Sequence, residues 1–140
     1  FKEQAKYLWK IYQTNTAPQN INRIAVRFIN RFDFPETDFE LSDYLNVFPQ
    51  FPEIQLAKGF SMQAILNQPD LDSTLIITQA LLSPIKPHTV SILLDFDLFN
   101  ETIRSVNDDF WSFLEQLRTR KNHFFENSIT EKTRRLISKR

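Results

Sequence analysis

The strand pattern over residues 89–99 (TVSILLDFDLF) constrains the fold more than any other part of the sequence. Side chains of successive residues in a strand point to opposite faces of the sheet. One face would be wholly apolar and would carry Val90, Ile92, Leu94, Phe96 and Leu98. The other face would hold two acidic side chains, Asp95 and Asp97, about 7 Å apart along the strand. The segment therefore predicts a strand that presents two carboxylates on one side.

A second long strand is predicted over residues 21–34, where the same alternation places arginines on one face. The apolar face carries Ile24, Val26, Phe28, Phe32 and Phe34, and the polar face carries Arg23, Arg27, Arg31 and Asp33. Asn30 is the one polar residue on the apolar side. Because a buried amide needs hydrogen-bond partners, we expect Asn30 to tie down a neighbouring loop or bulge.

The remaining periodicities predict two more strands and four helices. The strands are expected over 54–66 and 74–82, and the helices over 1–14, over 41–45, from 105 onward and from 128 onward. Ser105 is placed to cap the third helix, and Ser128 with Glu131 has the spacing of a capping box. The last helix is expected to turn Ile129, Thr133, Leu136 and Ile137 inward. Because short loops join the strands, the predicted fold is α+β, an antiparallel sheet of about four strands with helices packed mainly on one face.

The composition excludes several classes of function. The 140 residues fit a single α+β domain, residues 1–140. Lys and Arg together number 17, as do Asp and Glu, so no overall field attracts nucleic acid or an anionic membrane. The absence of cysteine fits a cytoplasmic location, and no apolar run is long enough to span a membrane. Gly59 is the only glycine, which excludes glycine-rich phosphate-binding loops.

Three interpretations of Asp95 and Asp97 are open. Paired carboxylates on a strand can hold a divalent cation against a phosphate group. The arginines of strand 21–34 can instead pair with both aspartates across the sheet, which is the interpretation we favour. A partly buried form of that network could bind a polar or anionic ligand through bidentate arginine contacts. The candidate ligand or charge network is Arg23, Arg27, Asn30, Arg31, Asp95 and Asp97.

The charges are also segregated along the chain. The acidic segment contains Asp33, Glu36, Asp38, Glu40, Asp43 and Glu53. The basic segment contains Arg118, Arg120, Lys121, Lys132, Arg134, Arg135, Lys139 and Arg140. The two segments either face each other within the fold, face a second subunit or form solvated surfaces, the last being the commonest fate of such runs.

Four segments together resemble a sporadically distributed family of uncharacterised bacterial proteins. They are residues 23–30 (RIAVRFIN), 41–45 (LSDYL), 94–97 (LDFD) and 124–130 (FFENSIT). Members of that family are longer and extend upstream, so the resemblance implies that this chain is the C-terminal portion of a longer protein. The family has no established activity, cofactor or catalytic residue to carry over. An open sheet edge or helix face would then favour self-association.

The sequence favours a non-enzymatic interaction or ligand-binding domain that works through its Arg/Asp sheet face, with a protein partner or a homodimer. No catalytic residue, metal ligand or cofactor is predicted, because no complete catalytic set is present and His88 and His123 lack ligand-spaced neighbours. One alternative is a metal-assisted enzyme that acts on a phosphate-bearing substrate through Asp95 and Asp97. Another is an antitoxin-like or defence-system protein that binds a protein partner.

Overall fold

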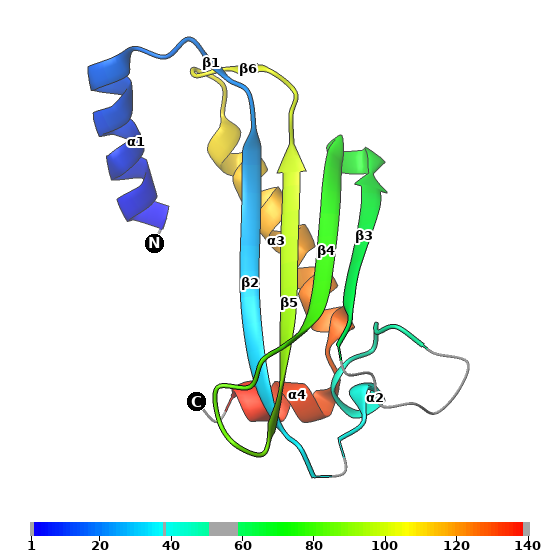
Figure 1. The fold of residues 1–140 in the computed structure, drawn as a ribbon. Helices are drawn as coiled ribbons and strands as arrows, with labels where there is room; N and C mark the ends of the chain where they lie inside the picture. The colour runs from blue at the N-terminus through cyan, green and yellow to red at the C-terminus, as the bar shows by residue number, and fades with distance from the viewer. Residues whose placement is uncertain (1, 38, 51–58, 139–140) are drawn as a thin grey trace.

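The computed structural model describes residues 2–37, 39–50 and 59–138, and its fold confirms the predicted α+β class (Figure 1). The elements are α1 (Lys2–Thr16), β1 (Asn20–Ile21), β2 (Ile24–Pro35), α2 (Leu41–Tyr44), β3 (Ser61–Gln68), η1 (Pro69–Leu71), β4 (Ser73–Leu82), β5 (Thr89–Asn100), β6 (Arg104–Ser105), α3 (Phe110–Ser128) and α4 (Glu131–Ile137). Within the described residues, no helix is both long enough and apolar enough to cross a membrane.

The main sheet has four antiparallel strands, as the sequence predicted. Their order in the sheet is β2-β5-β4-β3. Strand β5 lies inside this sheet, between β2 and β4. Short connections join β3 to β4 and β4 to β5, which is why these neighbours run antiparallel. A separate two-stranded sheet, β1 with β6, lies at one end of the main sheet, between the C-terminus of α1 and the N-terminus of α3.

One face of the main sheet packs against α3, which crosses behind β2 and β5 in Figure 1. Leu94, Phe96 and Leu98 on this face of β5 are fully buried. From α3, Leu117 is fully buried and the Phe125 ring lies edge-on to Phe96, with 6.1 Å between ring centres. Burying each such side chain stabilises the fold by about 1.5–3 kcal/mol, so this layer supplies most of the core.

A polar clamp joins α2 to the junction of α3 and α4. The Tyr44 carbonyl accepts hydrogen bonds from the Thr130 backbone N–H at 3.1 Å and the Thr133 hydroxyl at 2.6 Å. Leu45 and Ile129 form an isolated antiparallel bridge and are both buried. The Lys132 ammonium pairs with the Asp43 carboxylate at 2.7 Å. Here the acidic and basic segments of the chain do face each other within the fold.

Three details differ from the sequence predictions. Ser105 lies in β6 and does not cap α3; the Asp109 side chain caps that helix by accepting from the Ser112 N–H. Thr130 caps α4, because α3 continues through Ser128 and leaves no room for the predicted capping box. Leu136 and Ile137 are exposed rather than inward, since α4 packs through its first turn and ends soon after it.

Two predicted strands also have different bounds. The predicted strand 21–34 is interrupted after Ile21, where β1 leaves to pair with β6, and β2 begins at Ile24. The predicted strand 54–66 falls partly outside the described residues, and β3 begins at Ser61.

Lys121 of α3 is buried between the helix and β2, with 2% of its surface exposed. Its Nζ lies 2.9 Å from the centre of the Phe28 ring, a cation–π contact that partly offsets the lost hydration of the ammonium. Burial, and to a smaller extent the charge of Arg118, lowers the pKa of Lys121 to about 8. At neutral pH the buried Lys121 ammonium is still charged, and its lost hydration makes the packing of α3 on β2 less stable.

Replacing Lys121 with methionine should stabilise the fold by about 1–3 kcal/mol near neutral pH, because a buried cation is removed. In the wild type, the pKa of Lys121 is about 8 in the folded state against 10.5 in the unfolded state. The folded state thus binds fewer protons in that interval, and its stability should rise with pH across it. Urea unfolding of both proteins at about pH 7 and about pH 10 measures this. If the difference in free energy of unfolding between the variant and the wild type is the same at both pH values, the prediction is contradicted.

Candidate functional site

The candidate site is the face of the main sheet opposite α3, which we call the open face. It looks toward the viewer in Figure 1, and no described helix packs on it. The strand registers place on this face Ala25, Arg27, Ile29, Arg31 and Asp33 of β2, Ser91, Leu93, Asp95, Asp97 and Phe99 of β5, Thr74, Ile76, Thr78, Ala80 and Leu82 of β4, and Ser61, Gln63, Ile65 and Asn67 of β3. Arg23, just before β2, reaches the same face, where it binds Asp97.

Arg27 and Asp95 form the central ion pair of the open face. The register places Arg27 directly opposite Asp97, but its guanidinium reaches diagonally to Asp95. Nη2 donates to Oδ2 at 2.6 Å and Nε donates to Oδ1 at 3.1 Å. The hydrogen bonds to Asp95 raise the pKa of Arg27. The Asp95 side chain is only 9% exposed against 55% for Arg27, so the guanidinium covers the carboxylate.

Arg23 pairs with the second aspartate of β5. Its Nη2 donates to Asp97 Oδ2 at 3.0 Å, and its guanidinium lies over the Phe99 ring, 4.4 Å from the ring centre. The other carboxylate oxygen of Asp97 is buried and has no hydrogen-bond partner among the described residues. Asp97 is therefore held less completely than Asp95, which accepts from its arginine through both oxygens.

Arg31 does not join the pairs of Asp95 and Asp97. It donates to Asp33 at 3.1 Å and to the Ser91 hydroxyl at 2.8 Å, because its register position lies beyond the aspartates of β5. Asn30 lies on the α3 side of the sheet and donates to the Leu94 carbonyl at 3.2 Å. The expectation that Asn30 ties down a loop or bulge was wrong, since its amide bonds the backbone of the neighbouring strand.

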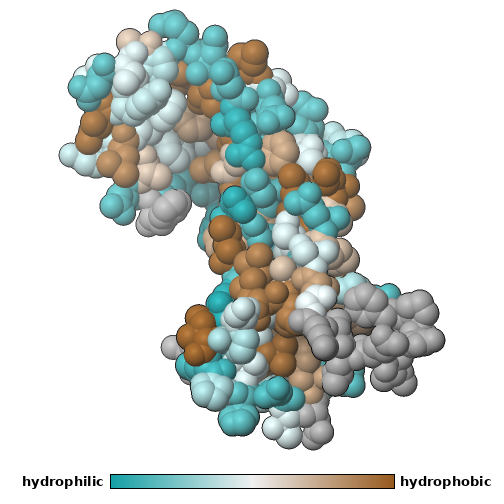
Figure 2. Space-filling model, in the orientation of Figure 1, coloured by the Kyte–Doolittle hydropathy of each residue, from teal (hydrophilic) through white to brown (hydrophobic). Residues whose placement is uncertain are grey.

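The open face divides into a charged half and a neutral half. All its charged side chains belong to the β2 and β5 half, where arginines and aspartates alternate. The β4 and β3 half carries only neutral residues, with Ile76 and Thr78 facing Ile65 and Gln63. Figure 2 shows hydrophilic and hydrophobic surface side by side on this face. Sequence reasoning missed the neutral half, although the alternation along β4 contained the signal.

The ion pairs bear directly on the metal hypothesis. Both oxygens of Asp95 already accept hydrogen bonds from Arg27, so a cation would have to displace a guanidinium. Asp97 would also need to leave Arg23. Among the described residues, no group of three or more His, Cys, Asp or Glu side chains is arranged to hold a metal ion. The arrangement is suited to stabilising the sheet and presenting a polar surface.

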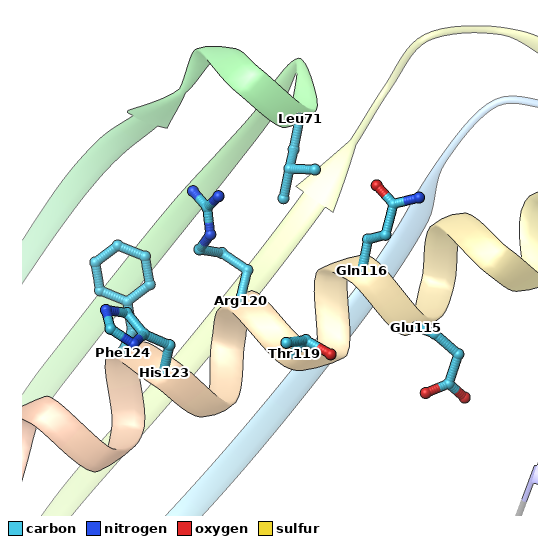
Figure 3. Close-up of a pocket in the computed structure, with 7 residues that line it drawn as sticks. All are labelled: Leu71, Glu115, Gln116, Thr119, Arg120, His123 and Phe124. Carbon is cyan, nitrogen blue, oxygen red and sulfur yellow. The ribbon is translucent and has the colours of Figure 1, made fainter.

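A groove of about 740 Å³ lies between α3 and the β3–β4 turn, on the other side of the sheet (Figure 3). Its lining includes Arg120, His123 and Leu71. The Arg120 guanidinium is bound to the Asp70 carboxylate and to the Gln68 side chain, and its pairing lowers the pKa of Asp70. The main cation of the groove is thus engaged in holding the hairpin against the helix.

Comparison with protein-family models, with curated proteins and with solved structures gives no significant match. The resemblance to a family of uncharacterised bacterial proteins therefore stays a prediction.

Replacing Arg27 with methionine should lower the free energy of unfolding by more than the same change at Arg23, because it leaves the buried Asp95 carboxylate without its donors. Replacing Arg23 with methionine should lower the free energy of unfolding by about 1 kcal/mol or less, since the Asp97 carboxylate is more exposed than that of Asp95. Urea unfolding gives both values, and a double-mutant cycle with Asp95→Asn should return a non-zero coupling energy for Arg27. Equal costs for the two arginines would show that burial of Asp95 is not what matters.

Proposed function

We propose that this chain is a non-enzymatic interaction domain that binds a protein partner through the open face of its sheet. The observation that carries the proposal is the exposure of large apolar side chains on that face. Ile29 is 63% exposed and Ile65 64%, although both belong to the main sheet. Ile65 lies beside Ile76 of β4, and contiguous apolar surface rimmed by polar residues is typical of protein interfaces.

The charge of the open face supports a protein partner over a polyanion. Arg23, Arg27 and Arg31 are each matched by an aspartate, so the face has no excess of positive charge. Binding to nucleic acid depends on unpaired cations that release counterions from phosphates. A neutral patch beside charged pairs instead resembles the core and rim of a protein–protein interface.

The proposal predicts that lysine at Ile65 removes binding, because it places a charge in the neutral half of the open face. Wild-type protein and the Ile65→Lys variant would be immobilised and exposed to lysate of the native host. Ile103→Lys is a matched control, because Ile103 is 68% exposed and lies in the loop after β5. Retention of a protein by wild type and control but not by Ile65→Lys is expected. No retained protein, or equal retention by all three, would overturn the proposal.

The alternative of a metal-assisted enzyme acting through Asp95 and Asp97 has weaker support, since arginines already bind both carboxylates. We therefore expect Mg²⁺ and Mn²⁺ to leave the melting temperature of the wild type unchanged. The Asp95→Asn variant is the comparison, because it keeps the shape of the side chain and removes its charge. Stabilisation of the wild type by metal, absent from the variant, would instead support the enzyme.

A further inference from the structure

Among the residues that the structure describes, the outer edge of β2 has no strand paired with it. β2 runs from Ile24 to Pro35 and forms a ladder with β5 on one side only. In the part of the chain that the structure describes, no hydrogen bond reaches the backbone of β2 from its other side. α1 is held against α3 by the Lys2–Glu115 ion pair and by the contact of Trp9 with Phe110. A long unpaired edge is a template for pairing with another strand.

Apolar side chains are exposed on both faces at the middle of this edge. Phe28 is 45% exposed on the α3 side of the sheet, and Ile29 is 63% exposed on the open face. A partner docked only on the open face would cover Ile29 and leave Phe28 exposed. A strand added beside β2 would place side chains next to both residues, since adjacent strands lie about 4.8 Å apart. Binding on the open face accounts for the exposure of Ile29 but not for that of Phe28, and the exposure of Phe28 therefore points to the edge.

The charges of β2 suit a second copy of the same strand. In an antiparallel pair about a two-fold axis at Phe28, Phe28 lies opposite Phe28 of the second copy. Arg23, the residue just before β2, then lies opposite Asp33 of the second copy, twice by symmetry, and Arg27 lies opposite Ile29. Within each copy, Arg23 also pairs with Asp97 and Asp33 with Arg31. Unlike charges at opposed positions stabilise a sheet by about 0.2–1 kcal/mol per pair, and like charges destabilise it.

The charge pattern also distinguishes the register with its axis at Phe28 from the neighbouring registers. An axis at Ile29 would set Arg27 opposite Arg31, and an axis at Arg27 would set two copies of that arginine face to face. An axis at Asn30 would again match unlike charges, Arg27 with Asp33, but would bring a polar amide rather than Phe28 to the centre. The exposure of Phe28 and the charge pattern together favour the axis at Phe28.

We propose that two copies of this chain pair antiparallel along β2, with Phe28 at the two-fold axis. The two four-stranded sheets become one sheet of eight strands, with both α3 helices on the same side. The open faces then form one continuous surface, with their charged halves in the middle. This assembly goes beyond the proposed function, which concerns a different protein bound on the open face.

Sedimentation analysis of the full chain tests the assembly. The wild type should have twice its chain mass of 16.7 kDa. Ile29→Lys should be a folded monomer, because each added lysine would lie opposite Arg27 of the other copy. Ile65→Lys, an equally exposed isoleucine on the other edge strand, should remain a dimer. A monomeric wild type, a dimeric Ile29→Lys variant or a monomeric Ile65→Lys variant would overturn the proposal.

A cross-linking experiment keeps the proposal testable if Ile29→Lys fails to fold. The chain has no cysteine, so Phe28→Cys introduces a single thiol at the two-fold axis. Opposed residues have Cβ atoms about 4.5–5.5 Å apart, close enough for a disulfide after small adjustment. Leu66→Cys is the control, because Leu66 lies on the same side of the sheet at the β3 edge. Rapid oxidation to a covalent dimer for Phe28→Cys alone is expected, and equal rates for both variants would contradict the two-fold pairing.

Discussion

The structure depends on β5, the strand that hydrogen-bonds to β2 on one side and β4 on the other. Its α3 side supplies buried apolar residues such as Leu94 and Phe96, and its open side supplies Asp95 and Asp97. An aspartate buried to this extent in an inner strand needs a compensating partner, and Arg27 supplies one. The Arg27–Asp95 pair is therefore a consequence of how deeply β5 lies in the fold.

The four segments that carry the family resemblance meet in space as two pairs. Residues 23–30 and 94–97 lie on β2 and β5 and are joined by the Arg27–Asp95 pair. Residues 41–45 and 124–130 form the clamp between α2 and the α3–α4 junction, through the bridge of Leu45 with Ile129. In this chain, each pair of segments is thus joined by a tertiary contact.

Much of the fold could be predicted from local patterns. Period-two alternation gave β2, β4 and β5, because each of these strands buries one face. Helical spacing gave α1, α2 and most of α3. The predictions failed at the ends of elements, as at Ser105 and Ser128. There, the residue that caps a helix is decided by where the preceding chain turns, and that turn is set by contacts between distant segments.

The candidate site, too, could be predicted from the sequence only in part. The sequence by itself determined that Asp95 and Asp97 share one face of a strand and that the arginines of β2 share one face of another, because alternation is a property of the extended backbone. Only the tertiary structure decided which arginine reaches which aspartate, since diagonal contacts depend on register and on side-chain length. It also decided that α3 covers the other face. That choice leaves Ile29, Ile65 and the charge pairs together on the open face, because a single helix can cover only one side of the sheet.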